Sequence, residues 1–244
     1  MRPSSDSQQL HFDSYARSYE AASGLTTPVA GRNIDRTARR HAAYLAAAPP
    51  GPVLELGAGT GFLTRHLAPL LAARPYLATD ISDGMLSVAR SAGRHLENVE
   101  WRHEDALALD VPDSWAACVV GHGVLHHLPL AESLTEISRV LAPHGRLAFC
   151  EPHLLNPLVF AQKKIPPCRP SLDTPGETAL RAGQMRALLR AHGFTDATII
   201  HVGFVPSGVR DPFALLVERA GYAAERLPLV RYLGASLLIY ASRQ

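Results

Sequence analysis

The feature that most constrains this chain is a glycine-rich turn between an apolar strand and a helix. Residues 53–61 read Val-Leu-Glu-Leu-Gly-Ala-Gly-Thr-Gly. Glycines at alternate positions let the backbone approach a ligand without a Cβ in the way, and the amides at a helix start attract carboxylates or phosphates. An open α/β sheet binds its ligand at such a turn, outside the carboxyl end of a strand. The turn therefore predicts an α/β protein with a ligand site beside residues 57–61.

Short apolar runs alternate with helical patterns along the rest of the chain. Strands are expected at 53–56, 76–79, 99–103, 117–120, 146–150, 197–202 and 235–241. Helices are expected at 12–22, 33–47, 61–72, 82–93, 130–141 and 177–192. Because strand–helix–strand crossovers are right-handed, this order predicts a seven-stranded, mostly parallel sheet with helices on both faces. Residues 1–10 are expected to be mobile, and the irregular Pro-rich stretch between 151 and 178 is expected to be a lid.

Length and composition are typical of one soluble domain with a small additional segment of chain. The chain has 244 residues, of which 47% are hydrophobic, enough to bury a sizeable core. We expect an N-terminal helical cap at 1–48 and a core at 49–244 that carries the lid at about 153–177. The 24 basic and 22 acidic residues nearly cancel, so neither nucleic acid nor a membrane is an expected partner.

Cysteine usage and the absence of long apolar runs place the chain in the cytoplasm. Its three cysteines lack Cys-x-x-Cys spacing, which argues against a disulfide framework or a cysteine zinc site. No run approaches the roughly 20 apolar residues of a membrane span, and the polar start lacks a signal peptide's apolar stretch. We expect a monomer or homodimer.

Three successive predicted strands carry acidic side chains at their ends. Glu55 lies inside the first strand, Asp80 ends the second, and Glu104-Asp105-Ala106 follows the third. The turn reads Gly-x-Gly-x-Gly rather than the dinucleotide fingerprint Gly-x-Gly-x-x-Gly, which disfavours NAD. A carboxylate at Glu55 suits an ammonium group, Asp80 suits ribose hydroxyls, and Asp105 suits an exocyclic amine. This order predicts a nucleoside that carries an amino acid.

Five segments form a set of motifs: ELGAGTG at 55–61, DISDGML at 80–86, EDA at 104–106, VLHHL at 124–128 and RVLAPHGRL at 139–147. As a set they resemble the class I S-adenosylmethionine-dependent methyltransferases, over residues 11–152. The resemblance implies a Rossmann-like fold, S-adenosyl-L-methionine as cofactor and a small-molecule methyl acceptor. The residues expected to contact the cofactor are Tyr19, Glu55, Gly57, Ala58, Gly59, Gly61, Asp80, Ile81, Met85, Glu104, Asp105, Ala106 and His122.

Methyl transfer needs an aligned acceptor and, for a phenol, alcohol or carbon acid, a base that removes a proton. The candidates near the predicted strand ends are His122, His126, His127, Glu151 and His153. The pair His126-His127 also suits turn hydrogen bonds. The spacing of these side chains gives little support to a zinc site, so no metal is expected. The fourth strand lacks the Asn/Asp-Pro-Pro-Tyr signature of nucleic-acid-base methylation, which favours a small-molecule acceptor.

The acceptor is left open by the sequence. An apolar segment at 154–160, followed by Lys163, Lys164 and Arg169, suggests an acceptor with an apolar body and an acidic group. Packing of that segment on the sheet is the alternative. We expect O-methylation in natural-product or metabolite biosynthesis, with C-methylation of a quinone-like or polyketide carbon as the alternative. A regulatory protein that binds the cofactor without transferring a methyl group is the alternative from another class.

Overall fold

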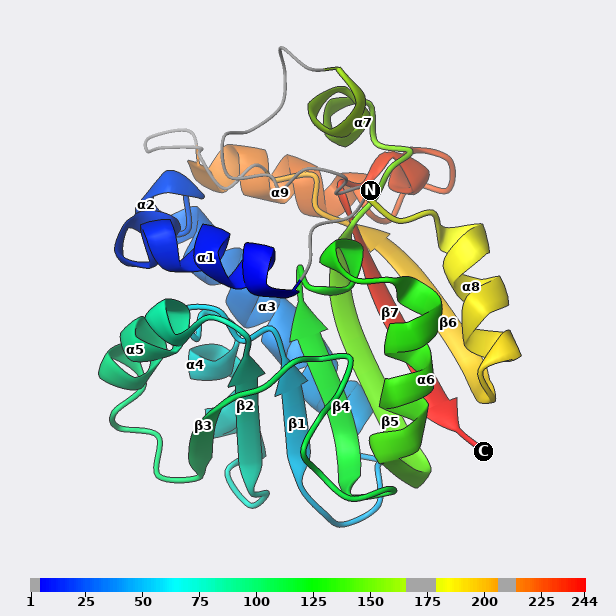
Figure 1. Cartoon of the computed structure of the whole chain (residues 1–244). Coiled ribbons are helices and arrows are strands. Elements are labelled where there is room, and N and C mark those ends of the chain that lie inside the picture. The colour runs from blue at the N-terminus through cyan, green and yellow to red at the C-terminus, as the bar shows by residue number, and fades with distance from the viewer. Residues whose placement is uncertain (1–4, 166–178, 206–213) are drawn as a thin grey trace.

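A seven-stranded sheet forms the centre of the computed structural model, which describes residues 5–165, 179–205 and 214–244 (Figure 1). The strands are β1 (Val53–Leu56), β2 (Tyr76–Asp80), β3 (Val99–His103), β4 (Ala116–His122), β5 (Leu141–Pro152), β6 (Phe194–Val202) and β7 (Ser236–Arg243). Their order is β3-β2-β1-β4-β5-β7-β6. Neighbouring strands are parallel except β7, which runs antiparallel to both β5 and β6. The predicted mostly parallel sheet is confirmed.

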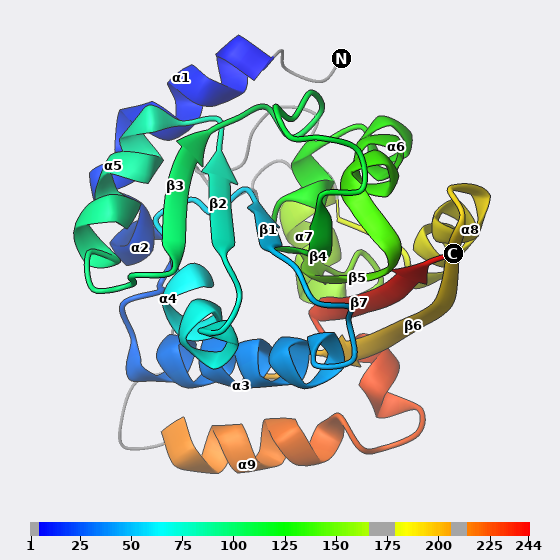
Figure 2. The ribbon, with the colours of Figure 1, turned by 90° about the horizontal axis from the view of Figure 1, so that it is seen from below.

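Helices cover both faces of the sheet (Figure 2). They are α1 (Ser5–Tyr15), η1 (Ala16–Ser18), α2 (Tyr19–Ala22), α3 (Pro28–Leu45), α4 (Thr64–Leu67), η2 (Ala68–Leu71), α5 (Asp83–Ala92), η3 (Leu125–His127), α6 (Leu130–Val140), α7 (Pro157–Lys164), α8 (Ala182–Ala191), α9 (Ala214–Ala224) and η5 (Val230–Leu233). Helices α3 and α4 pack in one core layer and α6 and α8 in the other. In β4, Val119 enters the α6/α8 layer and Val120 the α3/α4 layer, which is why this strand is apolar from residue 116 to residue 121.

Helix α3 begins earlier than the periodicity indicates. The Thr27 hydroxyl accepts a hydrogen bond from the backbone N–H of Ala30, and Pro28 occupies the first helical position. A Thr cap followed by Pro satisfies the free donors of a helix start, so the helix begins at residue 28 rather than 33. Helix α9 lies on the outer side of α3 (Figure 2), and the hydrophobic pattern did not predict it.

Two segments expected to be irregular contain helix. Residues 5–10 belong to α1, so the expectation of a mobile segment at 1–10 is wrong for that part. Helix α7 lies within the Pro-rich stretch because Asn156 accepts from the backbone N–H groups of Leu158 and Val159. The remainder of the predicted lid, including Arg169, lies outside the described residues. The lid and the domain limits stay predictions.

The segment 154–160 packs only in part. Leu154 and Val159 are buried in a small cluster with Ala179, whereas Leu155, Leu158 and Phe160 are exposed. None of the helices in the described parts of the chain combines the length and apolar character needed to cross a bilayer.

Substitution of Leu134 tests how much the packing of α6 on the sheet contributes to stability. Leu134 is fully buried in the α6/α8 core layer. Truncation removes contacts and leaves a cavity, so Leu134→Ala is expected to lower the free energy of unfolding by about 2–5 kcal/mol in urea titrations. Thr135→Ala, at the exposed next position of the helix, is the control and should change it by less than about 0.5 kcal/mol. Equal effects of both substitutions would contradict this packing.

Candidate functional site

The glycine turn after β1 borders a cavity at the carboxyl ends of β1, β2, β3 and β4, called here the first cavity. Gly57 has a φ of +61°, and a Cβ there would lie 2.5 Å from Cγ2 of Val124. Gly59 has a φ of +55°, and a Cβ there would have no neighbour within 4 Å. The turn is therefore pressed against the loop after β4 and leaves open space above Gly59.

The first cavity brings together most of the side chains that the sequence singled out. Those that line it are Tyr19, Glu55, Gly57, Ala58, Gly59, Asp80, Ile81, Met85, Glu104, Asp105, Ala106 and His122. Gly61 is the exception: a Cβ there would lie 2.7 Å from the indole of Trp101, so this glycine permits packing behind the turn. Their roles as ligand contacts stay predictions.

Asp80 joins the glycine turn to the start of α5. Its carboxylate accepts hydrogen bonds from the backbone N–H of Gly59 at 2.7 Å and of Ser82 at 2.9 Å. Burial raises the pKa of Asp80, and these two N–H groups partly offset the rise. The carboxylate is thus held in one orientation at the wall of the cavity, where its oxygens can accept from ligand hydroxyls.

The acids after β3 are oriented by their own loop. Glu104 accepts from the backbone N–H of Asp110 at 3.0 Å, and Asp105 from that of Leu107 at 2.9 Å. Both side chains line the first cavity on the side opposite the glycine turn's strand, with Ala106 beside them. The loop therefore presents preformed acceptors to a ligand.

Glu55 is a buried acid below the glycine turn. Its Oε2 accepts from the Tyr76 hydroxyl at 2.6 Å and from the Thr64 hydroxyl at 2.8 Å. Burial raises the pKa of Glu55 to about 7, although both hydroxyls lower it. A cationic group in the cavity would favour the ionised carboxylate. The site is therefore suited to a ligand with a positive charge at this point.

The N-terminal helices lie across the cavity and are attached to its rim at three places (Figure 1). The contacts join Gln8 to the carbonyl of His127, Asp13 to Ser82 and Gly84, and Glu20 to Thr60 and Arg65. In the second of these, Asp13 accepts from the Ser82 hydroxyl at 2.6 Å and from the Gly84 N–H at 2.8 Å. The N-terminal helices thereby form one wall of the site.

Sequence reasoning missed many of the residues that line the first cavity. They are Gln8, Phe12, Leu25, Thr60, Phe62, Leu63, Thr79, Leu107, Gly123, Val124, His127, Leu128 and Pro129, of which His127 was proposed only as a base. Several neighbour the predicted motifs, so extending each motif by a few residues would have found them. Gln8 and Leu25 carry no motif and reach the cavity only through the fold.

The five candidate bases separate into two groups. His122 and His127 line the first cavity, whereas His126, Glu151 and His153 do not. Glu151 is buried and accepts from the backbone N–H groups of Val124 at 3.0 Å and Leu125 at 2.9 Å. Its other oxygen lies 2.8 Å from Nδ1 of His126. Glu151 and His126 therefore hold the turn after β4.

Within the second group, His153 has a different hydrogen-bond partner. It is buried, and its Nδ1 is 3.0 Å from the carbonyl oxygen of Gly234. Burial lowers the pKa of His153.

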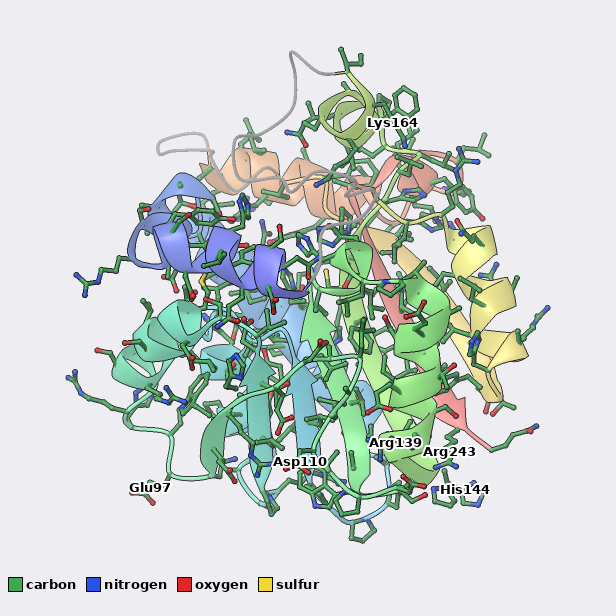
Figure 3. The ribbon with its side chains drawn as sticks, in the orientation of Figure 1. Glu97, Asp110, Arg139, His144, Lys164 and Arg243 are labelled. Carbon is green, nitrogen blue, oxygen red and sulfur yellow. The ribbon has the colours of Figure 1, made fainter. Side chains whose placement is uncertain are left out.

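The lysines of α7 lie at the same end of the molecule, where Figure 3 labels Lys164. Neither Lys163 nor Lys164 lines the first cavity.

A second cavity adjoins the first at His122. Helix α3, the ends of β4 to β7 and the segment after α9 form its walls, and Leu25, Phe62 and His122 line both cavities. Burial lowers the pKa of His122, and the carboxylate of Glu151 partly opposes this. Burial raises the pKa of the Cys150 thiol, which also lines the second cavity, to about 12. His122 therefore lies where the two cavities meet, with a lowered pKa that favours the neutral imidazole.

Metal-binding side chains do not converge in this site. Within residues 5–165, 179–205 and 214–244, no three His, Cys, Asp or Glu side chains lie close enough together to hold a metal ion.

Part of the chain is similar to known proteins. Residues 53–145 match a family model described as "Methyltransferase domain". The chain is 32% identical to the 2-phytyl-1,4-naphtoquinone methyltransferase of Thermosynechococcus vestitus, over 40% of this chain and 44% of that protein. It is 32% identical to the ubiquinone/menaquinone biosynthesis C-methyltransferase UbiE of Shewanella frigidimarina, over 57% of each chain. The chain spans about half the length of these curated relatives.

Structural similarity covers more of the chain than sequence similarity does. A crystal structure of a SAM-dependent methyltransferase from Thermotoga maritima, described as a possible histamine N-methyltransferase, superposes with a TM-score of 0.66. It is 16% identical and covers 96% of this chain and 99% of its own. At this identity the likeness establishes the fold alone, and it confirms the predicted Rossmann-like architecture.

Glu55 makes the stability of the ligand-free protein depend on pH. Its folded pKa of about 7 lies above the unfolded value of 4.5, so its contribution is fully present below pH 4.5 and is lost as the pH rises through 7. Glu55→Gln removes this dependence. The free energy of unfolding of the wild type, relative to this variant, should fall by about 3 kcal/mol between pH 4.5 and 7.

Chemical denaturation across this pH range measures the difference. Glu97→Gln, an exposed position at the edge of the molecule (Figure 3), is the control and should follow the wild type at every pH. Parallel curves for wild type and Glu55→Gln would mean that folding does not change the pKa of Glu55.

Proposed function

We propose that this protein, whose residues 53–145 match the methyltransferase-domain model, transfers a methyl group from S-adenosylmethionine to a ring carbon of a quinone-like small molecule. The observation that carries the proposal is the position of His122 between two adjoining cavities. The first cavity is assigned to the cofactor and the second to the acceptor. The reacting atoms would then meet beside a neutral imidazole.

The residues of the first cavity fit the cofactor at each of its parts. Glu55, buried and without a cationic partner among its hydrogen bonds in the described residues, suits the ammonium group. Asp80 suits the ribose hydroxyls, and Asp105 suits the adenine amine. The open space above Gly59 leaves room for the methionine part. Bound there, the cofactor supplies an electrophilic methyl group on a sulfonium sulfur.

The chain's own contribution is alignment, exclusion of water and removal of one proton. His122 takes the proton of a ring hydroxyl onto an imidazole nitrogen, which leaves negative charge on the acceptor and raises the reactivity of the neighbouring ring carbon. Glu151 acts as a positioning residue, because it fixes the turn that directly follows His122. The N-terminal helices close the cofactor side against water.

The relatives favour carbon over oxygen as the methylated atom. The sequence alone suggested O-methylation because histidines were available as bases. Two similar proteins carry names that refer to naphthoquinone or quinone biosynthesis, and one is named a C-methyltransferase. Carbon methylation of a quinol also needs a base, so His122 has the same role in either reaction. The alternative of a quinone-like carbon is therefore the better supported function.

Binding of S-adenosylhomocysteine tests the cofactor site. Isothermal calorimetry should show binding to the wild type, and Asp80→Asn should weaken it by about 1.5–3 kcal/mol because a charged hydrogen-bond acceptor is lost. Asp110→Asn, exposed and outside the first cavity, should bind as the wild type does. A wild type that releases no heat and shows no thermal shift would contradict the proposed cofactor.

Methyl transfer tests the role of His122. With 1,4-naphthoquinol as acceptor, His122→Asn is expected to lower kcat by about 10²–10⁴-fold, because the general base is lost, while leaving S-adenosylhomocysteine affinity within a few-fold. His144→Asn, at the opposite end of the sheet in Figure 3, is the control. Mass spectrometry of the product distinguishes a ring methyl from a methyl ether, and an ether would contradict the carbon assignment.

A further inference from the structure

We propose that the second cavity binds the acceptor as an oxyanion and that the guanidinium of Arg40 is the group that holds the charged oxygen. The inference rests on the proposed function and deepens it: it specifies an acceptor with an ionised hydroxyl on an apolar ring. Of the basic residues that the sequence pointed to, Lys163 and Lys164 do not line the second cavity, and Arg169 lies outside the described residues.

Two arginines, one helical turn apart on α3, line the second cavity together with a single carboxylate. Arg36 is bound to both oxygens of Glu225, at 2.8 and 2.5 Å, and its guanidinium lies 4.1 Å from the centre of the Tyr222 ring. Arg40 reaches Oε2 of Glu225 at 3.3 Å. Among the described residues this is the one hydrogen bond of its guanidinium, which has five N–H donors. Within the described parts of the chain, Arg36 is thus occupied and Arg40 retains donors for a ligand.

The lining of the second cavity carries more positive than negative charge. Its charged and titratable side chains are Arg36, Arg40, His122, Cys150, Tyr222 and Glu225. Burial raises the pKa of the Cys150 thiol and of the Tyr222 hydroxyl and lowers the pKa of His122, which favours the uncharged form of each. Two guanidinium groups therefore face one carboxylate. An oxyanion beside Arg40 would complete the charge balance.

The remaining walls suit a ring rather than a fully polar ligand. Ile34, Phe62 and Leu158 are among the apolar side chains that line the cavity. His122 lies where this cavity meets the first one. The O–H bond of the acceptor breaks, its proton passes to an imidazole nitrogen of His122, and the electron pair remains on the oxygen beside Arg40. Arg40 thereby lowers the free energy of the ionised acceptor, in which the ring carbon is the stronger nucleophile.

A pair of matched probes tests this charge recognition. 2-Hydroxy-1,4-naphthoquinone is ionised at neutral pH, whereas 2-methoxy-1,4-naphthoquinone has the same ring and no charge. Both are titrated by calorimetry into the protein saturated with S-adenosylhomocysteine. The wild type should bind the ionised probe more tightly. Arg40→Met should lose about 10–100-fold in affinity for the ionised probe and less than about threefold for the neutral one. Arg40→Lys, which keeps the charge, should recover part of the loss.

Arg32→Met is the matched control. Arg32 lies on the same helix and forms an equivalent ion pair with Glu218 of α9 at 2.8 Å, but it lines neither cavity. The control should bind both probes as the wild type does, and thermal melts identify any variant that fails to fold.

The outcomes separate this inference from the proposed function. If the wild type binds S-adenosylhomocysteine but not the ionised probe, or if Arg40→Met lowers the affinity for both probes equally, the oxyanion site is wrong and the cofactor assignment stands. If Arg32→Met causes the same selective loss as Arg40→Met, the effect comes from α3–α9 packing and the inference is overturned. If the wild type binds no S-adenosylhomocysteine, the proposed function itself fails.

Discussion

One buried carboxylate holds together the part of the molecule on which the site depends. Glu151, on β5, accepts from two successive backbone N–H groups after β4 and contacts the imidazole of His126. A buried carboxylate is tolerated only with such partners, so the turn has one conformation. That conformation presses Val124 against Gly57 of the glycine turn and sets the end of the strand that carries His122. The cofactor turn, the proposed base and the turn after β4 are therefore coupled through one side chain.

Helix α3 connects the fold to the proposed acceptor chemistry. Its apolar face, with Ile34 and Ala38, packs in the core layer over the sheet. Its polar side carries Arg36 and Arg40, which meet Glu225 after α9. Because α9 covers α3 from outside (Figure 2), these ion pairs lie at a wall of the second cavity rather than in open solvent. The same helix thus stabilises the sheet and gives the cavity its charge.

The sequence and the similar proteins together restrict the cofactor and acceptor of the proposed reaction more than either does alone. Acids after three strands indicate a cofactor with an ammonium group, a ribose and an amine. The proposed quinone-like carbon acceptor rests on the names of relatives of which this chain spans about half the length. The candidate bases illustrate the limit of sequence reasoning: His122, Glu151 and His153 all lie near strand ends, but only His122 reaches the first cavity. Proximity to a strand end does not determine the direction of a side chain.

By itself the sequence determined the elements whose causes are local. Apolar runs, the glycine turn and the acids at the strand ends predicted the parallel sheet and about half of the residues that line the first cavity, because parallel strands bring their carboxyl ends to one edge. Only the tertiary structure decided which distant segments complete the site. Gln8 and Asp13 reach the cavity rim, and Arg40 and Glu225, 185 positions apart, meet at the second cavity. Such contacts arise from chain packing, and no local propensity or spacing encodes them.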